Sequence, residues 1–281
     1  MSTPARISSL HVYPIKSCRG LSLPRVQVTP RGFAWDREWM VVDPSGTFLT
    51  QREAPCLALV QTDLTADHLL VSAPGMDPLL VPLASADSKP SRSIQVWSFT
   101  GPADDEGEAA AIWWSAYLGR PARLVRWNPK VIRWSDPKWT GEFRAPNAFS
   151  DGYPILVVSQ ASLSDLNQRR QPEQPLPMNR FRPNLVLTGT TPYAEDHHSH
   201  LQIGGIELKA VKPCPRCVVT TTNQETGLVE GKDPLQTLAT YRRNVRAGGV
   251  IFGQNVVIIR GSGLWLEVGQ SAELTDPIEL P

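Results

Sequence analysis

Short runs of β-branched and aromatic residues, separated by turn residues, are the feature that most restricts the fold of this chain. The first hundred residues alternate such runs with turn chemistry: RISSLHVYP, EWMVVDPSGTFLT, LALVQTDL, HLLVSAPG, PLLVPL and SIQVWSF. Strands at this short spacing predict a barrel or a sandwich. The segment 43–46 (DPSG) between two runs predicts a hairpin turn. The 26 prolines and 20 glycines mark many further turns, which argues against a helical bundle.

Helical periodicity interrupts this pattern in a few places. Residues 104–119 (DDEGEAAAIWWSAYLG) start with two acidic residues and end at a glycine, so they predict a helix. We expect its apolar face to consist of Ala109, Ile112, Trp113, Ala116 and Tyr117. A second helix is expected after the strand YPILVV, capped by Ser159. A third fits DPLQTLATYRR, with Asp233 as its cap and Pro234 in its first turn.

The second half of the chain adds strands of the same kind. These are NLVLTG, IGGIELKAVK, CVVTTT, NVVIIR and LWLEVGQ. Residues 131–148 form a polar, tryptophan-containing connection that holds Pro137 and Pro146. We therefore place a domain boundary near this connection and expect two domains, residues 1–125 and 126–281. The fold class expected is mixed α/β, dominated by β structure, with a few short helices.

Composition excludes several classes of partner. The 28 Lys and Arg residues nearly cancel the 27 Asp and Glu residues, so the net charge of +1 favours neither nucleic acid nor an anionic membrane surface. We find no signal-peptide pattern and no run of ~18 apolar residues, so we expect a soluble protein without a membrane partner. The four cysteines are sparse for a chain of this length, and we expect free thiols in a reducing compartment.

The segment PCPRC places Cys214 and Cys217 three positions apart and allows three kinds of site. A redox pair needs a helix N-terminus, but residues 218–222 (VVTTT) are β-branched and predict a strand. A structural zinc ion needs four ligands, which only the histidines of residues 197–200 (HHSH), otherwise a solvated loop, could complete. The third possibility is one thiolate as the single protein ligand of a metal whose other ligands come from a cofactor.

A cofactor held by one thiolate also needs partners for its anionic parts. In NRFRPNLVL, Pro183 opposes helix, so we expect an extended segment with Arg180, Arg182 and Asn184 on one face. Two guanidinium groups and an amide on one face suit a phosphate or a polar heterocycle. The alternative for this segment is a salt-bridged edge strand.

Two segments near the start of the chain offer further anion donors. Lys16 and Ser17, in YPIKSCRG, follow a strand end, where a backbone turn can present donors to an anion. A solvated turn is the alternative. Arg37, in GFAWDREWMVVD, is either a further phosphate donor or the ion-pair partner of Asp36.

Together these segments resemble the MOSC family, in the branch with an N-terminal β-barrel-like domain that includes the mitochondrial amidoxime reducing component and YcbX-like proteins. The resemblance is carried by LHVYPIKSCRG, GFAWDREWMVVD, FLTQREAPCLALV, NRFRPNLVLTG, AEDHHSHLQIGGIELKAVKPCPRCVVTTTNQETG, PLQTLATYRR and FGQNVVI. It covers nearly the whole chain. It implies a MOSC N-terminal β-barrel-like domain over residues 1–125 and a molybdenum-ligating MOSC β-barrel domain over residues 126–281.

The resemblance implies a molybdenum cofactor, Mo-molybdopterin, bound between the two domains. Cys217 matches the family's metal ligand, and Asp151 matches an acidic residue near the metal, a candidate proton relay. The positions that match cofactor-binding residues of the family are Lys16, Ser17 and Arg37 at the phosphate end, Arg180, Arg182 and Asn184 near the pterin, and Thr220 and Thr221 after the metal ligand.

The reaction implied by the resemblance is the two-electron reduction of a small N-hydroxylated substrate, which releases the oxygen as water. No cysteine follows Cys217, and no anchor segment precedes the first expected strand. We therefore expect a cytoplasmic, bacterial enzyme that takes electrons from a separate reductase carrying flavin, haem or an iron–sulphur cluster. The alternative is a MOSC module that binds the molybdenum cofactor, or carries sulphur for it, without reducing N-hydroxylated compounds.

Overall fold

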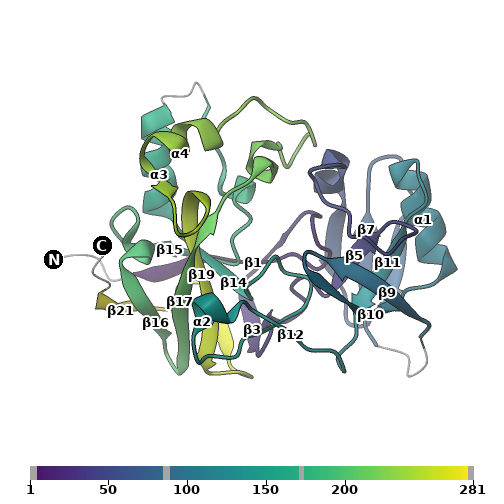
Figure 1. The fold of residues 1–281 in the computed structure, drawn as a ribbon, viewed down its shortest axis with the longest axis horizontal. Coiled ribbons are helices and arrows are strands. Elements are labelled where there is room, and N and C mark those ends of the chain that lie inside the picture. Colours follow the sequence, from purple (N-terminus) through teal and green to yellow (C-terminus); the bar gives the residue numbers. More distant parts are fainter. Residues whose placement is uncertain (1–4, 85–88, 171–173, 278–281) are drawn as a thin grey trace.

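Two lobes lie side by side in the computed structural model, which describes residues 5–84, 89–170 and 174–277 (Figure 1). The first lobe holds the strands β5 to β11 and the helix α1. The second lobe holds the remaining helices and most other strands, including the first and last described strands, β1 and β21. Strands dominate throughout, which confirms the expected fold class.

The second lobe is built on one sheet with the strand order β2-β1-β15-β14-β19-β17-β16-β21, in which β18 also pairs with β19. The bounds of these strands are β1 (Arg6–Val12), β2 (Leu21–Leu23), β14 (Ile155–Ser159), β15 (Leu185–Thr188), β16 (His198–Ile203), β17 (Ile206–Pro215), β18 (Arg243–Asn244), β19 (Gly249–Arg260) and β21 (Glu273–Pro277). Because β1 pairs antiparallel with β15, the start of the chain completes this sheet. The division of the chain at residues 125 and 126 stays a prediction.

Alternating side chains of these strands form the core of the second lobe. Along β1, Ile7, Leu10 and Val12 are buried, as expected for a strand with one face on a core. The neighbouring sheet β20-β3-β4 packs its apolar residues Val26, Val28, Phe33 and Leu266 into the same core. Its strands are β3 (Arg25–Thr29), β4 (Gly32–Phe33) and β20 (Trp265–Glu267).

The first lobe contains a four-stranded sheet, β5-β11-β10-β9, and a three-stranded sheet, β6-β7-β8. The bounds are β5 (Trp39–Val42), β6 (Gln61–Leu64), β7 (His68–Ser72), β8 (Leu79–Pro82), β9 (Ser91–Val96), β10 (Phe99–Asp105) and β11 (Arg123–Trp127). The expected turn at residues 43–46 is confirmed, because the amide of Gly46 donates to the carbonyl of Asp43 at 3.0 Å. A short 3-10 helix, η1 (Pro55–Leu59), follows this region.

The helix α1 (Glu108–Leu118) departs from the expectation at its start and on its buried face. The prediction that the helix starts at Asp104 and Asp105 was wrong, because these two residues belong to the end of β10. The expected apolar face was wrong at Ala109, Ile112 and Ala116, which are exposed. The helix instead buries Ala110, Trp113 and Trp114, because burying two large indole rings removes more apolar surface from water than burying Ile112. Gly119 ends the helix in a left-handed conformation, as expected.

The other expected helices are confirmed as α3 (Gln160–Arg170) and α4 (Leu235–Tyr241). Ser159 Oγ caps α3 by accepting from the amide of Ser162 at 3.1 Å. The expected cap of α4 was wrong by one residue, because Pro234 occupies the N-cap position; Asp233 Oδ1 still accepts from the amide of Thr237 at 3.1 Å. The connection 131–148 contains α2 (Pro137–Thr140) and the pair β12 (Arg133–Trp134) and β13 (Pro146–Asn147). Among the described residues, no helix has the length and apolarity needed to cross a bilayer.

Candidate functional site

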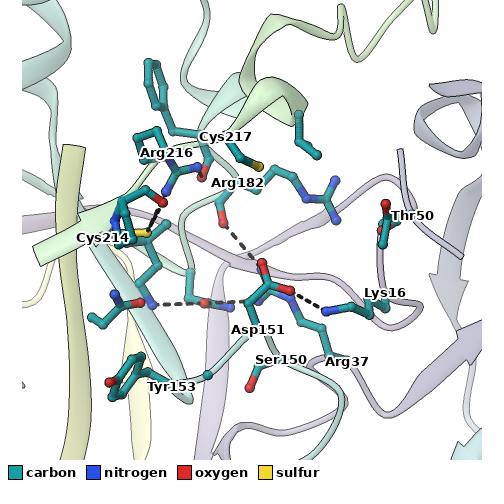
Figure 2. Close-up of a pocket in the computed structure, with 18 of the residues that line it drawn as sticks. Lys16, Arg37, Thr50, Ser150, Asp151, Tyr153, Arg182, Cys214, Arg216 and Cys217 are labelled. Carbon is teal, nitrogen blue, oxygen red and sulfur yellow. Dashed lines mark hydrogen bonds and ion pairs between the residues drawn. The ribbon is translucent and has the colours of Figure 1, made fainter. Parts of the chain in front are cut away.

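A pocket lies where the two lobes meet, and both lobes contribute charged side chains to its wall (Figure 2). The first lobe and the loops before it contribute Lys16, Ser17, Arg37, Thr50 and Arg52. The second lobe contributes Asp151, Tyr153, Arg182, Asn184, Arg216 and Cys217. The structure thus brings together most of the residues that the sequence selected, from segments far apart in the chain.

A largely buried, hydrogen-bonded cluster lies in and behind one part of the wall, and we call it the inner network: Arg37, Arg182 and Asn184, which line the pocket, and Tyr13 and Asp36 behind them. Asp36 accepts from the amide of Tyr13 at 2.9 Å and from Arg37 Nη1 at 2.5 Å. Arg37 Nη1 also donates to Asn184 Oδ1 at 3.1 Å. Arg37 and Arg182 lie over the Tyr13 ring, 4.2 and 4.3 Å from its centroid. Burial raises the pKa of Asp36, and the Arg37 guanidinium opposes that shift.

Three of the predicted site residues have an unusual backbone conformation. Ser17, Arg37 and Arg182 have φ values of 69°, 49° and 53°, in the left-handed region that glycine adopts most easily. Such conformations cost roughly 1–3 kcal/mol each and collect at ligand-binding and active sites. Their concentration on one pocket wall supports a binding function for that wall.

Lys16 and Asp151 form an ion pair in the pocket (Figure 2). The Lys16 side chain is 5% exposed and also donates to the carbonyl of Phe149 at 2.9 Å, whereas the Asp151 side chain is 76% exposed toward the pocket. Burial lowers the pKa of Lys16, against the opposing effect of Asp151. Desolvation acts to raise the pKa of Asp151, but the nearby cations, Lys16 first and then Arg37 and Arg52, together outweigh it and hold that pKa well below its usual range. Asp151 is therefore ionised near neutral pH.

The outer part of the site, which we call the rim, consists of the pocket residues Arg52 and Cys217 and of Trp97, whose ring lies against the Arg52 guanidinium. Cys217 is a free, half-buried thiol two residues after the end of the long strand β17, at the N-cap of the 3-10 helix η4 (Val218–Thr221). Arg52 Nη2 lies 3.3 Å from Cys217 Sγ, and its guanidinium lies over the Trp97 ring, 4.8 Å from the centroid. The thiol sulphur is thus presented to the pocket beside a cation.

The neighbouring cysteine has a different environment. Cys214 is a free thiol within β17, and its Sγ accepts from Arg216 Nη1 at 2.9 Å. The expected strand over residues 218–222 was wrong, because residues 218–221 form η4. This turn forms because the amides of Thr220 and Thr222 donate back to the carbonyls of Cys217 and Val219, at 3.1 and 3.2 Å. Strand propensity alone therefore does not argue against a redox pair.

The segment NRFRPN is not extended, so that expectation was wrong. Residues 178–180 form a 3-10 helix, η2, and Arg182 has a left-handed backbone, so the three polar side chains do not share one face. Arg182 and Asn184 reach the pocket. Arg180 instead donates to the carbonyl of Thr221 at 2.8 Å and pairs with Glu230.

Thr220 and Thr221 also lie behind the pocket wall rather than on it. Their hydroxyls donate to the carbonyls of Cys217 and Val218, at 2.9 and 2.7 Å, so they stabilise the turn that follows the thiol. Cofactor contacts by Arg180, Thr220 and Thr221 stay predictions, and the geometry gives these residues a part in shaping η4.

The histidine-rich segment was expected to be a solvated loop, and this was wrong. His198 to His200 begin the strand β16, which pairs with β17 and β21. The register pairs His200 with Lys209, and its Nδ1 lies 3.0 Å from Asp276 Oδ2. Strand pairing on both sides explains the order of this segment. Within the described ranges, no group of three or more His, Cys, Asp or Glu residues is arranged to hold a metal.

Several pocket residues were not selected from the sequence. Arg216 stood inside the PCPRC motif, and it donates through Nη2 to the carbonyl of Phe181 at 2.7 Å. Tyr153 follows Asp151 in the segment SDGYP, and Thr50 and Arg52 follow the hairpin in FLTQRE. A basic residue within the cysteine motif was a usable signal for Arg216, whereas no local pattern marks Arg52.

Comparison with known families assigns both parts of the chain. Residues 4–121 match the model of the MOSC N-terminal beta barrel domain, and residues 144–273 match the model of the MOSC domain. Both matched regions supply residues of the pocket: Lys16, Arg37 and Arg52 come from the first, and Arg182 and Cys217 from the second.

Named relatives cover most of the chain. Mitochondrial amidoxime reducing component 2 of Rattus norvegicus is 37% identical over 84% of this chain and 72% of the relative. Mitochondrial amidoxime-reducing component 1 of Mus musculus is 35% identical over 98% of this chain and 82% of the relative. Molybdenum cofactor sulfurase of Oryza sativa subsp. japonica is 33% identical over 94% of this chain but only 35% of the relative. The chain therefore belongs to the MOSC family, among the proteins with a MOSC N-terminal beta barrel domain that include the mitochondrial amidoxime-reducing components.

Proposed function

We propose that this protein is a molybdenum-cofactor-dependent oxidoreductase that reduces small N-hydroxylated compounds. The observation that carries the proposal is the free Cys217 thiol, which opens into a pocket whose wall holds five cationic side chains. These cations are Lys16, Arg37, Arg52, Arg182 and Arg216. The names of the relatives connect the family with the molybdenum cofactor and with amidoxime reduction.

The residues of the pocket fit the chemical groups of Mo-molybdopterin. A thiolate suits a soft metal, and a half-buried thiol with no disulfide partner is available as Cys217. The phosphate of the cofactor needs cationic or amide donors, which this wall supplies in excess over its acidic groups. The Nε atom of Arg216 is buried without a hydrogen-bond partner beside the two cysteines, so a donor remains free at this place.

Each site residue then has a distinct part in the proposal. Cys217 is the protein ligand of molybdenum, and η4 fixes its backbone. Lys16, Ser17 and Arg37 bind the phosphate end, and Arg182 and Asn184 bind the pterin. When bound, the cofactor supplies the two-electron chemistry that removes the oxygen of an N-hydroxyl group as water. Arg180, Thr220 and Thr221 support the thiol through the hydrogen bonds around η4.

Asp151 is the proposed proton-handling residue. Because Lys16 keeps its carboxylate ionised near neutral pH, Asp151 is poised to accept a proton or to orient water, and it is a poor proton donor while that ion pair holds. Trp97 Nε1 donates to the same carboxylate at 3.3 Å, which ties Asp151 to the rim. A relay through Asp151 therefore requires the Lys16 contact to weaken first.

The remaining parts of the proposal concern partners and location. Electrons would come from a separate flavin, haem or iron–sulphur protein, and the enzyme would work in the cytoplasm. The second candidate function is a module that binds the cofactor or carries sulphur for it, without reductase turnover. The match to the plant molybdenum cofactor sulfurase over 94% of this chain favours keeping that candidate.

The test combines cofactor analysis with one substitution. Protein from a host that makes the cofactor should contain molybdenum and pterin, and should reduce benzamidoxime with reduced methyl viologen as the electron donor. Cys217→Ser should lower this activity by about a thousandfold, as expected when a metal ligand is replaced, whereas Cys56→Ser, at a thiol outside the pocket, should not change it. Cofactor without turnover in the wild type would favour the second candidate, and full activity in Cys217→Ser would contradict the role of Cys217 as the metal ligand.

A further inference from the structure

The cationic side chains of the pocket differ in whether a carboxylate of the protein is paired with them. Lys16 is paired with Asp151, and Arg37 is paired with Asp36. Arg52 is exposed and has no carboxylate within ion-pair distance among the described residues. Its one side-chain hydrogen bond is the contact from Nη2 to Cys217 Sγ at 3.3 Å. Arg52 is thus a cation at the rim whose charge no neighbouring carboxylate cancels.

Stacking, rather than hydrogen bonding to oxygen, holds the Arg52 guanidinium in place. It lies over the Trp97 ring at 4.8 Å, and Trp97 is itself fixed by the bond from Nε1 to Asp151 at 3.3 Å. A stacked guanidinium keeps its N–H edge free, and that edge matches a carboxylate with two parallel hydrogen bonds. The Nη2 contact to Cys217 Sγ uses one N–H group, and the rim therefore presents the remaining N–H groups of Arg52 as a free, oriented donor edge beside the thiol.

The turn that carries Arg52 is built so that the nearest acidic residue does not neutralise it. Both oxygens of Glu53 accept from Thr50, from its amide and from its hydroxyl, each at 2.8 Å. The amide of Arg52 donates to Thr50 Oγ1 at 3.1 Å. Glu53 is therefore used inside the turn, and Arg52 points into the pocket.

Two amides fix this turn to the opposite lobe. Gln51 Nε2 donates to Gln224 Oε1 at 3.1 Å, and Gln224 Nε2 donates back to Gln51 Oε1 at 3.0 Å. Both side chains are buried, and Gln224 also donates to the carbonyl of Thr222, just after η4. Arg52 is therefore held at a set position relative to Cys217, although 165 residues separate them in the chain.

We propose that Arg52 is a specificity residue that selects N-hydroxylated substrates bearing a carboxylate. This inference rests on the proposed function and names its substrate class. A carboxylate on the substrate would take the free edge of Arg52 while the N-hydroxyl group faces Cys217. The carboxylate of Asp151 also lines the pocket. Because it is paired with Lys16, it adds little repulsion against a negatively charged substrate.

The kinetic test compares 4-carboxybenzamidoxime with its methyl ester, which has nearly the same shape and no charge. With reduced methyl viologen as donor, wild-type kcat/KM should be about tenfold higher for the carboxylate, a factor typical of a hydrogen bond to a charged group. Arg52→Ala should remove this preference through KM, so that the carboxylate and the ester have nearly equal kcat/KM. Arg52→Lys should keep part of the preference for the carboxylate, because a lysine ammonium keeps the positive charge but cannot form the two parallel hydrogen bonds of a guanidinium.

Arg25 offers a matched control, because its guanidinium also lies 4.8 Å from the centroid of a tryptophan ring, that of Trp265, and neither residue lines the pocket. Arg25→Ala should leave the preference unchanged. Binding of both compounds to the oxidised, cofactor-loaded protein, measured by calorimetry without a donor, should show the same tenfold discrimination and its loss in Arg52→Ala. Molybdenum content should be equal in all variants.

The outcomes separate this inference from the proposed function. Equal kcat/KM for the carboxylate and the ester in the wild type would overturn the role of Arg52 while leaving the reductase intact. An equal fall for both compounds in Arg52→Ala, or a loss of molybdenum, would make Arg52 part of the cofactor site instead. If the loaded wild type reduces neither compound, the proposed reaction fails, and calorimetry still decides whether Arg52 binds the carboxylate.

Discussion

The inner network and the rim of the pocket are built in opposite ways. In the inner network, Asp36, Arg37 and Asn184 are tied by hydrogen bonds; Asp36 and Asn184 are buried, and the Arg37 side chain is 13% exposed. At the rim, Arg52 rests on one aromatic ring and one sulphur contact and is exposed. A buried, fully bonded cluster is pre-organised for a ligand that stays, whereas a sparsely bonded, exposed group suits a ligand that comes and goes. The contrast agrees with a resident cofactor on one part of the wall and a changing substrate on the other.

The largest expected effect breaks the inner network at Asp36. Asp36→Ala leaves the Arg37 guanidinium and the amide of Tyr13 without their buried acceptor, so we expect a loss of about 3 kcal/mol in the free energy of unfolding. Urea unfolding of the cofactor-free protein measures it. Arg52→Ala should change stability by less than about 0.5 kcal/mol, as is usual for exposed positions. Similar losses in the two variants would remove the contrast between the two regions.

A smaller effect separates two arginines that are neighbours in the sequence. Arg180 is buried and bonds to Thr221 and Glu230 behind the thiol, whereas Arg182 belongs to the inner network. Arg180→Lys should cost about 2 kcal/mol of stability, because a lysine cannot reproduce both contacts, and should leave molybdenum bound. Arg182→Lys should lower the ratio of molybdenum to protein. The opposite pattern would place Arg180 on the cofactor and support its prediction from the sequence.

The sequence predicted those parts of the fold that local chemistry determines. The hairpin at residues 43–46, the cap of α3 by Ser159 and the dominance of strands all follow from residues next to one another in the chain. For α1 the residues on both faces are apolar, so periodicity could not decide which face meets the core. The free energy gained by burying Trp113 and Trp114 determined which face of the helix meets the core.

The candidate site shows the same limit. Cys217, Arg37 and Asn184 could be selected because they lie in recognisable segments. The left-handed backbone of Arg182 could not, because nothing in NRFRPN requires it and it depends on contacts with Tyr13 and Gln224 from distant segments. Arg52 was missed for a related reason: its position depends on the amide pair between Gln51 and Gln224, which joins residues 173 positions apart. Local patterns do not encode such contacts.

The smallest expected effect is a pH dependence of stability caused by Tyr13, at the centre of the inner network. Burial raises the pKa of its phenol from 10.0 to about 12, and the guanidinium groups of Arg182 and Arg37 oppose but do not cancel this shift. Above pH 10 the unfolded chain releases this proton while the folded protein keeps it, so the unfolded state binds fewer protons and stability falls as pH rises toward 12. The contribution is complete below pH 10, and we expect it to decline by about 1 kcal/mol between pH 10 and pH 11.

Tyr13→Phe removes that pH dependence and also the hydrogen bond to the carbonyl of Pro183, which is 3.0 Å long. At pH 8 the variant should therefore be less stable than the wild type by about 1 kcal/mol, and the difference should shrink by pH 11. Urea unfolding at pH 8, 10 and 11 measures this, and the other tyrosines and lysines titrate in both proteins and cancel in the difference. Absorbance at 295 nm, titrated in parallel, should show one late-ionising phenol fewer in the variant. A constant difference in stability across this range would mean that Tyr13 is solvated, and that the inner network opens to water in the way the rim does.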